Sequence, residues 1–89
     1  MKARVLVRFR PGVLDPQGLT IQKALRGKGF VEVQDLRVGK VFEFTLDETD
    51  PARARTRLDD MCRVLLANPV IEEYACEVVE DARERPPAG

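Results

Sequence analysis

The stretch of residues 36–42 constrains the fold of this chain most strongly. Two apolar runs meet there at Gly39-Lys40, and a glycine at the first central position of a two-residue loop can adopt the positive φ of a type II′ turn. The sequence therefore predicts a β-hairpin between strands at residues 30–38 and 41–47. Apolar residues fall on both faces of this hairpin, whereas one face is enough for the core of a small monomer. The second face is a candidate surface for another chain.

Composition narrows the classes of function. The chain has 89 residues, enough for one domain whose small core is often supplemented by oligomerisation. Its 15 basic and 15 acidic residues cancel, which argues against general binding to nucleic acid or to a membrane surface.

The sequence has neither a signal peptide nor an apolar run of membrane-spanning length, so a cytoplasmic protein is expected. It contains no histidine, the commonest metal ligand and general base. Cys62 and Cys76 are isolated and are predicted to fill core space.

Hydrophobic patterns predict six elements. Alternating apolar and polar residues indicate four strands, at residues 2–10, 30–38, 41–47 and 70–80. Two amphipathic helical patterns lie between them, one after the first strand and one after the third. The order β-α-β-β-α-β is that of the ferredoxin-like open sandwich, an α+β fold in which two helices cover one face of an antiparallel sheet. The first and last strands are then antiparallel neighbours, and Arg4 and Arg8 of one can face Glu73 and Glu77 of the other.

Several residues are predicted to define turns and helix ends: Pro11, Gly12, Asp15, Pro16, Asn68 and Pro69. Asp15 is expected to cap the first helix with Pro16 at its first position, before the helix ends near residues 27–29. The second helix begins at Thr49 or Asp50, and it ends before Asn68 because a residue that precedes proline is pushed out of the α region. An anion could also bind at the start of the first helix, but Asp15 already offers a carboxylate to its N–H groups.

Few residues could carry chemistry. The pairs Asp59-Asp60 and Glu72-Glu73 are adjacent in sequence, so their carboxylates diverge on a helix or a strand. No glycine-rich phosphate loop is present. Arg37 and Lys40 could contact a charged partner, but basic residues near a turn could equally serve solubility. The residues therefore indicate a small dimerising α+β module for which neither catalytic residues nor a metal nor a cofactor is expected.

Three stretches together resemble one family: residues 11–18, 36–40 and 61–72, which read PGVLDPQG, LRVGK and MCRVLLANPVIE. The chain is similar to PurS, the small subunit of bacterial and archaeal phosphoribosylformylglycinamidine (FGAM) synthase. The similarity runs from residue 2 to about residue 79. It implies a PurS-like domain at residues 1–80, followed by a flexible polar tail at residues 81–89.

The resemblance implies a role in de novo purine synthesis, where formylglycinamide ribonucleotide, ATP and glutamine are converted to formylglycinamidine ribonucleotide. In that family PurL is the synthetase that binds ATP and magnesium, and PurQ is the glutaminase. PurS carries neither activity; it forms a homodimer, possibly a tetramer, brings the two subunits together and supports ammonia transfer between them. The expected assembly surface is the predicted hairpin turn, formed by Leu36, Arg37, Val38, Gly39, Lys40 and Val41.

Three other readings share the order of elements. A regulatory domain of the ACT type would bind a small molecule at a dimer interface, and it is the main alternative. An RNA-recognition module needs aromatic residues on the open face of the sheet, but Phe9, Phe42 and Phe44 align with the core face. An acylphosphatase-like enzyme needs an arginine loop that grips phosphate, which Arg10-Pro11-Gly12 imitates poorly.

Overall fold

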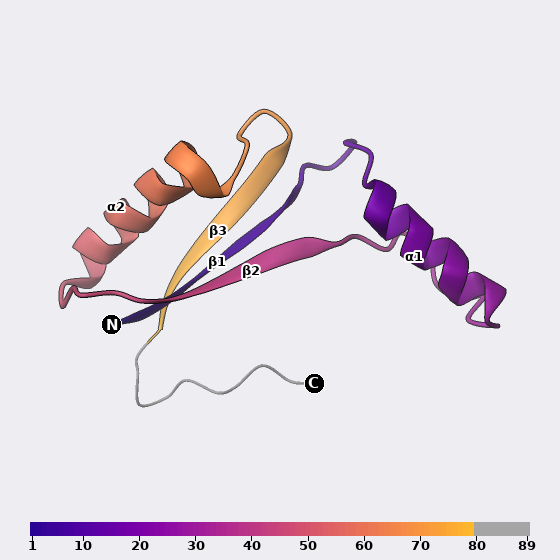
Figure 1. Cartoon of the computed structure of the whole chain (residues 1–89), viewed down its shortest axis with the longest axis horizontal. Helices are drawn as coiled ribbons and strands as arrows, with labels where there is room; N and C mark the ends of the chain where they lie inside the picture. Colours follow the sequence, from indigo (N-terminus) through magenta and orange to yellow (C-terminus); the bar gives the residue numbers. More distant parts are fainter. Residues whose placement is uncertain (80–89) are drawn as a thin grey trace.

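The structure, a computed structural model, describes residues 1–79. Three strands form one antiparallel sheet in the order β2-β1-β3 (Figure 1). The elements are β1 (Lys2–Phe9), α1 (Pro16–Gly27), β2 (Gly39–Thr45), α2 (Pro51–Met61), a π-helical turn (Cys62–Leu66) and β3 (Glu72–Val79). The predicted class, an α+β fold with an antiparallel sheet and two helices, is confirmed. The tail predicted at residues 81–89 lies outside the described part of the chain.

The core lies between the sheet and α2. The central strand β1 contributes three alternate residues that are almost fully buried, Ala3, Val5 and Val7. Leu58 of α2 packs against this face, and both Leu58 and Ala54 have no exposed surface. The outer strands add partly buried side chains to the same core: Phe42, Phe44, Tyr74, Cys76 and Val78. The alternation in the sequence therefore identifies the buried face of each strand correctly.

The predicted hairpin at Gly39-Lys40 is wrong. No strand is formed at residues 30–38, and Gly39 is instead the first residue of β2, directly opposite Arg8 of β1. Gly39 does not have a positive φ, so it forms no type II′ turn. A glycine is needed here for a steric reason, because a Cβ at this position would lie 2.8 Å from the carbonyl oxygen of Val7. The glycine thus allows β2 to approach β1 where the two strands meet.

The connection between α1 and β2 bonds to the helix instead of to a strand. The helix ends in a Schellman motif, in which Phe30 N–H donates to Leu25 O and Gly29, at φ 103°, donates to Arg26 O. The Arg26 guanidinium then donates to the carbonyls of Val31 and Val33, at 2.6 and 2.9 Å. Because the helix satisfies these carbonyls, the segment has less need of a sheet partner.

Helix α1 lies beyond one end of the sheet, not on its face as predicted (Figure 1). Gly18 is its only buried residue, and Leu19 and Ile21 are exposed. The chain measures 48 × 31 × 14 Å with a radius of gyration of 16.1 Å, whereas a compact chain of this length would have about 12 Å. A single copy of the chain therefore leaves the apolar residues of α1 without a partner.

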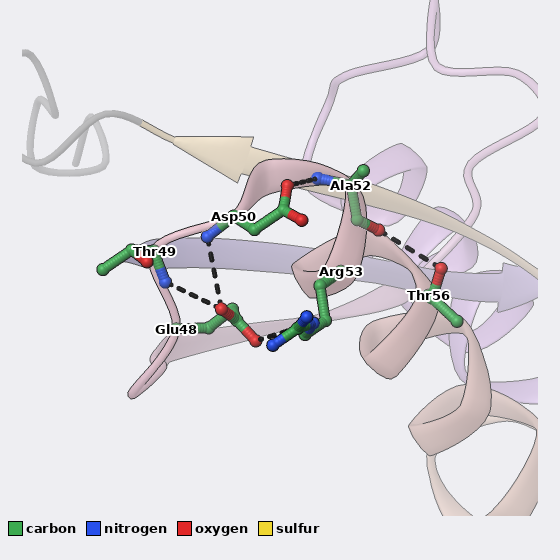
Figure 2. A network of polar contacts seen from close by, with 6 residues as sticks. All are labelled: Glu48, Thr49, Asp50, Ala52, Arg53 and Thr56. Atoms are coloured by element: carbon green, nitrogen blue, oxygen red, sulfur yellow. Dashed lines mark hydrogen bonds and ion pairs between the residues drawn. The ribbon is translucent and has the colours of Figure 1, made fainter.

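A polar network fixes the start of α2 (Figure 2). The side chain of Asp50 accepts the N–H of Ala52 at 3.0 Å, so Asp50 and not Thr49 is the N-cap. The carboxylate of Glu48 accepts the N–H groups of both Thr49 and Asp50 and lies 3.7 Å from Arg53. These hydrogen bonds hold the pKa of Glu48 below its ordinary value, and the bond from Asp50 has the largest effect.

Candidate protein-interaction surface

The face of the sheet opposite α2 carries an exposed apolar row. Leu6 of β1 pairs with Val41 of β2 on one side and with Ala75 of β3 on the other, so the three side chains share one face. Leu6 is 46% exposed and Val41 57% exposed. Since α2 packs on the other face, the row has no cover in a single chain. We call this side of the sheet the open face.

Charged residues flank this apolar row on both sides. Arg8 lies opposite Glu73, and its Nε donates to Glu73 Oε1 at 2.8 Å. Arg4 lies opposite Glu77, and its Nε is 3.7 Å from Glu43 Oε2 on the other neighbouring strand. The pairing predicted from charge segregation is therefore confirmed. Exposed ion pairs add little stability, but these pairs leave the open face close to neutral.

A groove of about 640 Å³ crosses the open face where β2 begins. Its floor includes the apolar row, and its rim includes Arg8 and Glu73. Five of the six residues predicted for assembly line it: Arg37, Val38, Gly39, Lys40 and Val41. The sixth, Leu36, does not, because its backbone lies against α1, with its N–H directed at Gln22 Oε1 and its carbonyl over Gly18.

Asp15 holds this edge of the groove in place. One carboxylate oxygen accepts the N–H of Gly18 and caps α1, and the other accepts the N–H of Val38, both at 2.8 Å. Asp15 is almost fully buried. Its two N–H donors lower the pKa of Asp15 below the ordinary value of 3.8, and the bond from Val38 has the larger effect. Sequence reasoning anticipates the cap but not the second bond, since nothing local pairs Asp15 with a residue 23 positions away.

Arg37 binds the turn that precedes α1. Its Nη2 donates to the carbonyl of Val13 at 2.9 Å and to that of Arg10 at 3.3 Å. Gly12 has φ 85°, and Val13 N–H donates to Arg10 O, so Pro11-Gly12 is the corner of a tight turn. Part of the donor capacity of Arg37 is thus used within the chain, and the sequence gives no sign of this.

The turn at Asn68-Pro69 joins the same end of the molecule. The helical segment stops at Leu66, and Asn68 uses its carbonyl to accept the N–H of Glu72 at 2.7 Å. The guanidinium of Arg10 donates twice to the carbonyl of Pro69, at 2.8 and 3.1 Å. The turns before α1 and before β3 therefore form one unit beside the groove.

The carboxylates that could have formed an acid–base pair have other partners. Glu73 pairs with Arg8, whereas Glu72 accepts the N–H of Asn68. Asp59 accepts the hydroxyl of Tyr74 at 2.5 Å, and this bond raises the pKa of Tyr74 to about 12. Within residues 1–79, no group of three or more acidic or cysteine side chains is placed to hold a metal ion. The fold and this surface define a small α+β binding module with an open sheet face.

Comparison with known proteins gives this module a family. The profile of "PurS: Phosphoribosylformylglycinamidine (FGAM) synthase" matches residues 2–80. A PurS subunit from Synechocystis is 47% identical over 84% of this chain and 75% of its own length. The chain belongs to the PurS family and is a PurS subunit of FGAM synthase, as the resemblance implied.

Solved structures of PurS proteins match the fold of this chain and support the same family. The crystal structure of Bacillus subtilis PurS matches with a TM-score of 0.80 and 44% identity, over 89% of this chain and 98% of that one. A structure named PurLQS, from Thermotoga maritima, matches with a TM-score of 0.78 and 34% identity, over 85% of this chain and 93% of that one. These matches to PurS proteins do not favour the alternative, a regulatory domain of the ACT type.

None of the helices in the described part of the chain could cross a lipid bilayer.

Proposed function

We propose that this chain is the non-catalytic assembly subunit of its FGAM synthase. It holds the PurL synthetase and the PurQ glutaminase together and supports ammonia transfer between them. It carries no cofactor, because ATP and magnesium bind to the synthetase. It works in the cytoplasm as a homodimer. The structure of Thermotoga maritima PurLQS, whose name joins the three subunits, supports this assignment of partners.

The exposed apolar row of Leu6, Val41 and Ala75 is the observation that carries the proposal. Its neighbours Arg8 and Glu73 bond to each other, so their charges already have a partner within the chain. A small charged ligand would need free polar groups directed at it. A polypeptide surface needs an apolar centre with a polar rim, and the groove has this composition.

Self-association has a second basis in α1. The helix and the connection after it expose apolar side chains that a single copy of the chain does not cover: Leu19, Ile21, Phe30 and Val31. Apolar surface of this extent beside a thin sheet is typical of a chain that completes its fold with another copy. We therefore assign the open face and α1 to contacts between chains.

Reconstitution tests the proposal. The chain is mixed with PurL and PurQ from the same organism, and glutamine-dependent formation of formylglycinamidine ribonucleotide is measured with and without it. The product should form at the full rate only when all three proteins are present. If omission of this chain leaves the rate unchanged, the proposed function is wrong.

Charge substitutions locate the surface. Leu6→Glu and Val41→Glu place a carboxylate in the apolar row without entering the core, so they should weaken assembly in light scattering and reduce the reconstituted rate. Val64→Glu is the matched control, because Val64 is 83% exposed and lies on the helical side of the molecule. Loss of assembly with Val64→Glu alone would place the contact beside the π-helical turn and contradict our assignment.

A further inference from the structure

The two cysteines of this chain meet inside the core. Cys62 begins the π-helical turn after α2, and Cys76 lies in the middle of β3, opposite Val5 of β1. Their Sγ atoms are 3.9 Å apart, and both thiols are free. The chain has no third cysteine. A thiol pair at van der Waals contact is therefore built into the interface between helix and sheet, and the assembly role makes no use of it.

The two thiols differ in access. Cys62 has no exposed surface, whereas Cys76 is partly exposed. Burial and the neighbouring Cys76 thiol raise the pKa of Cys62 to about 12, so Cys62 is not the first sulfur to react. A small oxidant that enters from solvent reaches Cys76 first. Cys62, whose Sγ lies 3.9 Å from that of Cys76, is then the one other thiol that can react with the oxidised site.

We infer that Cys62 and Cys76 form a reversible intrachain disulfide when the protein meets hydrogen peroxide. The Cys76 sulfur attacks the peroxide; an S–O bond forms, the O–O bond breaks, and one water leaves. The Cys62 sulfur then attacks the Cys76 sulfur; the S–S bond forms and the S–O bond breaks. The leaving hydroxide takes up the Cys62 proton and departs as a second water. Two thiols lose two electrons in total, and one peroxide gains them.

The geometry requires a small movement. The Sγ–Sγ distance must shorten from 3.9 Å to about 2.05 Å. The π-helical turn is where we expect this shift, because Cys62 is its first residue and the N–H of Ala67 at its end bonds to Cys62 O in the wide i to i−5 pattern. Turns of this kind are rare and are frequently found at functional sites. The new bond would tie this turn to β3 and restrict the unfolded chain, so the oxidised protein should resist urea better.

The test uses the full chain, reduced and then treated with one equivalent of hydrogen peroxide. Mass spectrometry after alkylation should show the loss of two hydrogens, no alkylated thiol and a linked peptide pair containing Cys62 and Cys76. Dithiothreitol should restore the original mass. In a glutathione redox buffer, the effective concentration of the thiol pair should be at least about tenfold higher in the native state than in urea.

Single variants provide the controls. Cys76→Ala removes a partly exposed sulfur and should fold normally, and Cys62→Ala removes the buried one. Neither variant should gain resistance to urea on oxidation, whereas the parent chain should. Cys76 sulfinic acid without a crosslink, a disulfide between two chains, or thiols that stay alkylatable would each overturn the inference. A crosslink that forms equally well in urea would also overturn it, because the native geometry would then contribute nothing.

Discussion

The carboxylate of Asp15 accepts the backbone N–H of Val38 at 2.8 Å, across 23 positions of the chain. Its other oxygen accepts the N–H of Gly18, also at 2.8 Å. One side chain therefore joins the start of α1 to the segment that leads into β2 and lines the groove. The direction in which α1 leaves the sheet depends on this junction.

Asp15→Ala should lower the melting temperature by several degrees, because it removes a helix cap and leaves the N–H of Val38 without its acceptor. Asp15→Ser is the informative comparison, since a serine can still cap Gly18 but is too short to reach Val38 as well. Amide hydrogen exchange at Val38 should accelerate in both variants, while protection within α1 should be lost mainly in the alanine variant. Unchanged exchange at Val38 would show that this bond does not fix the groove.

Two glycines of α1 should respond in opposite directions to alanine. Gly27 has open space around it, so Gly27→Ala should stabilise the protein by about 0.5–1 kcal/mol through helix propensity. At Gly18 a Cβ would lie 2.6 Å from the carbonyl oxygen of Leu36. Gly18→Ala should therefore cost about 1–3 kcal/mol, because backbone has to move. Urea denaturation of both variants measures the difference, and equal effects would mean that the segment does not cross the helix there.

Gly39→Ala tests why the chain needs a glycine where β2 begins. The added Cβ would meet the carbonyl oxygen of Val7 at 2.8 Å, so the first pairing of β2 with β1 should be lost at a cost of about 1–3 kcal/mol. Amide exchange should accelerate at Gly39 and its neighbours and not at the far end of β2. Uniform destabilisation along β2 would contradict a local steric cause.

Much of the fold could be predicted from the sequence because its signals are local. Alternation identifies the core faces of β1 and β3, and the Asp-Pro pairs before α1 and α2 specify both helix starts. Residues 30–38 could not be predicted in this way. Val31 and Val33 alternate as in a strand, but the Arg26 guanidinium takes their carbonyls and Asp15 takes the N–H of Val38. These competing partners lie elsewhere in the sequence, so a local pattern does not reveal them.

The interaction surface shows the same division. The predicted assembly surface rests on a hairpin that does not form and on the family resemblance, yet its residues 37–41 line the groove. Val41 is exposed on the uncovered face of the sheet, so its apolar side chain indicates a contact surface with or without the hairpin. Leu6 could be recognised from the sequence as part of this surface, because it is the one apolar residue on the basic face of β1. Ala75 carried none, since a small residue in a strand fits either face. Its position emerges only from the pairing with Leu6.

Acid should weaken the start of α2 in a way that can be assigned to Glu48. Two backbone N–H donors favour its ionised form and hold its pKa below the ordinary value of 4.5. In the window below pH 4.5 the unfolded chain then binds more protons than the folded one at this residue. The stabilising contribution is therefore fully present above this window and is lost as pH falls through the folded pKa.

Glu48→Gln removes this titration while its side-chain carbonyl can still accept the N–H groups of Thr49 and Asp50. The variant should be less stable than the parent at pH 7, because the charge that favours these donors and Arg53 is gone. The difference between the two proteins should shrink as the pH falls below 4.5 and through the lowered pKa of folded Glu48, because the parent then also becomes protonated. Urea denaturation across this range measures it. A difference that stayed constant with pH would mean that Glu48 acts through the shape of its side chain and not through its charge.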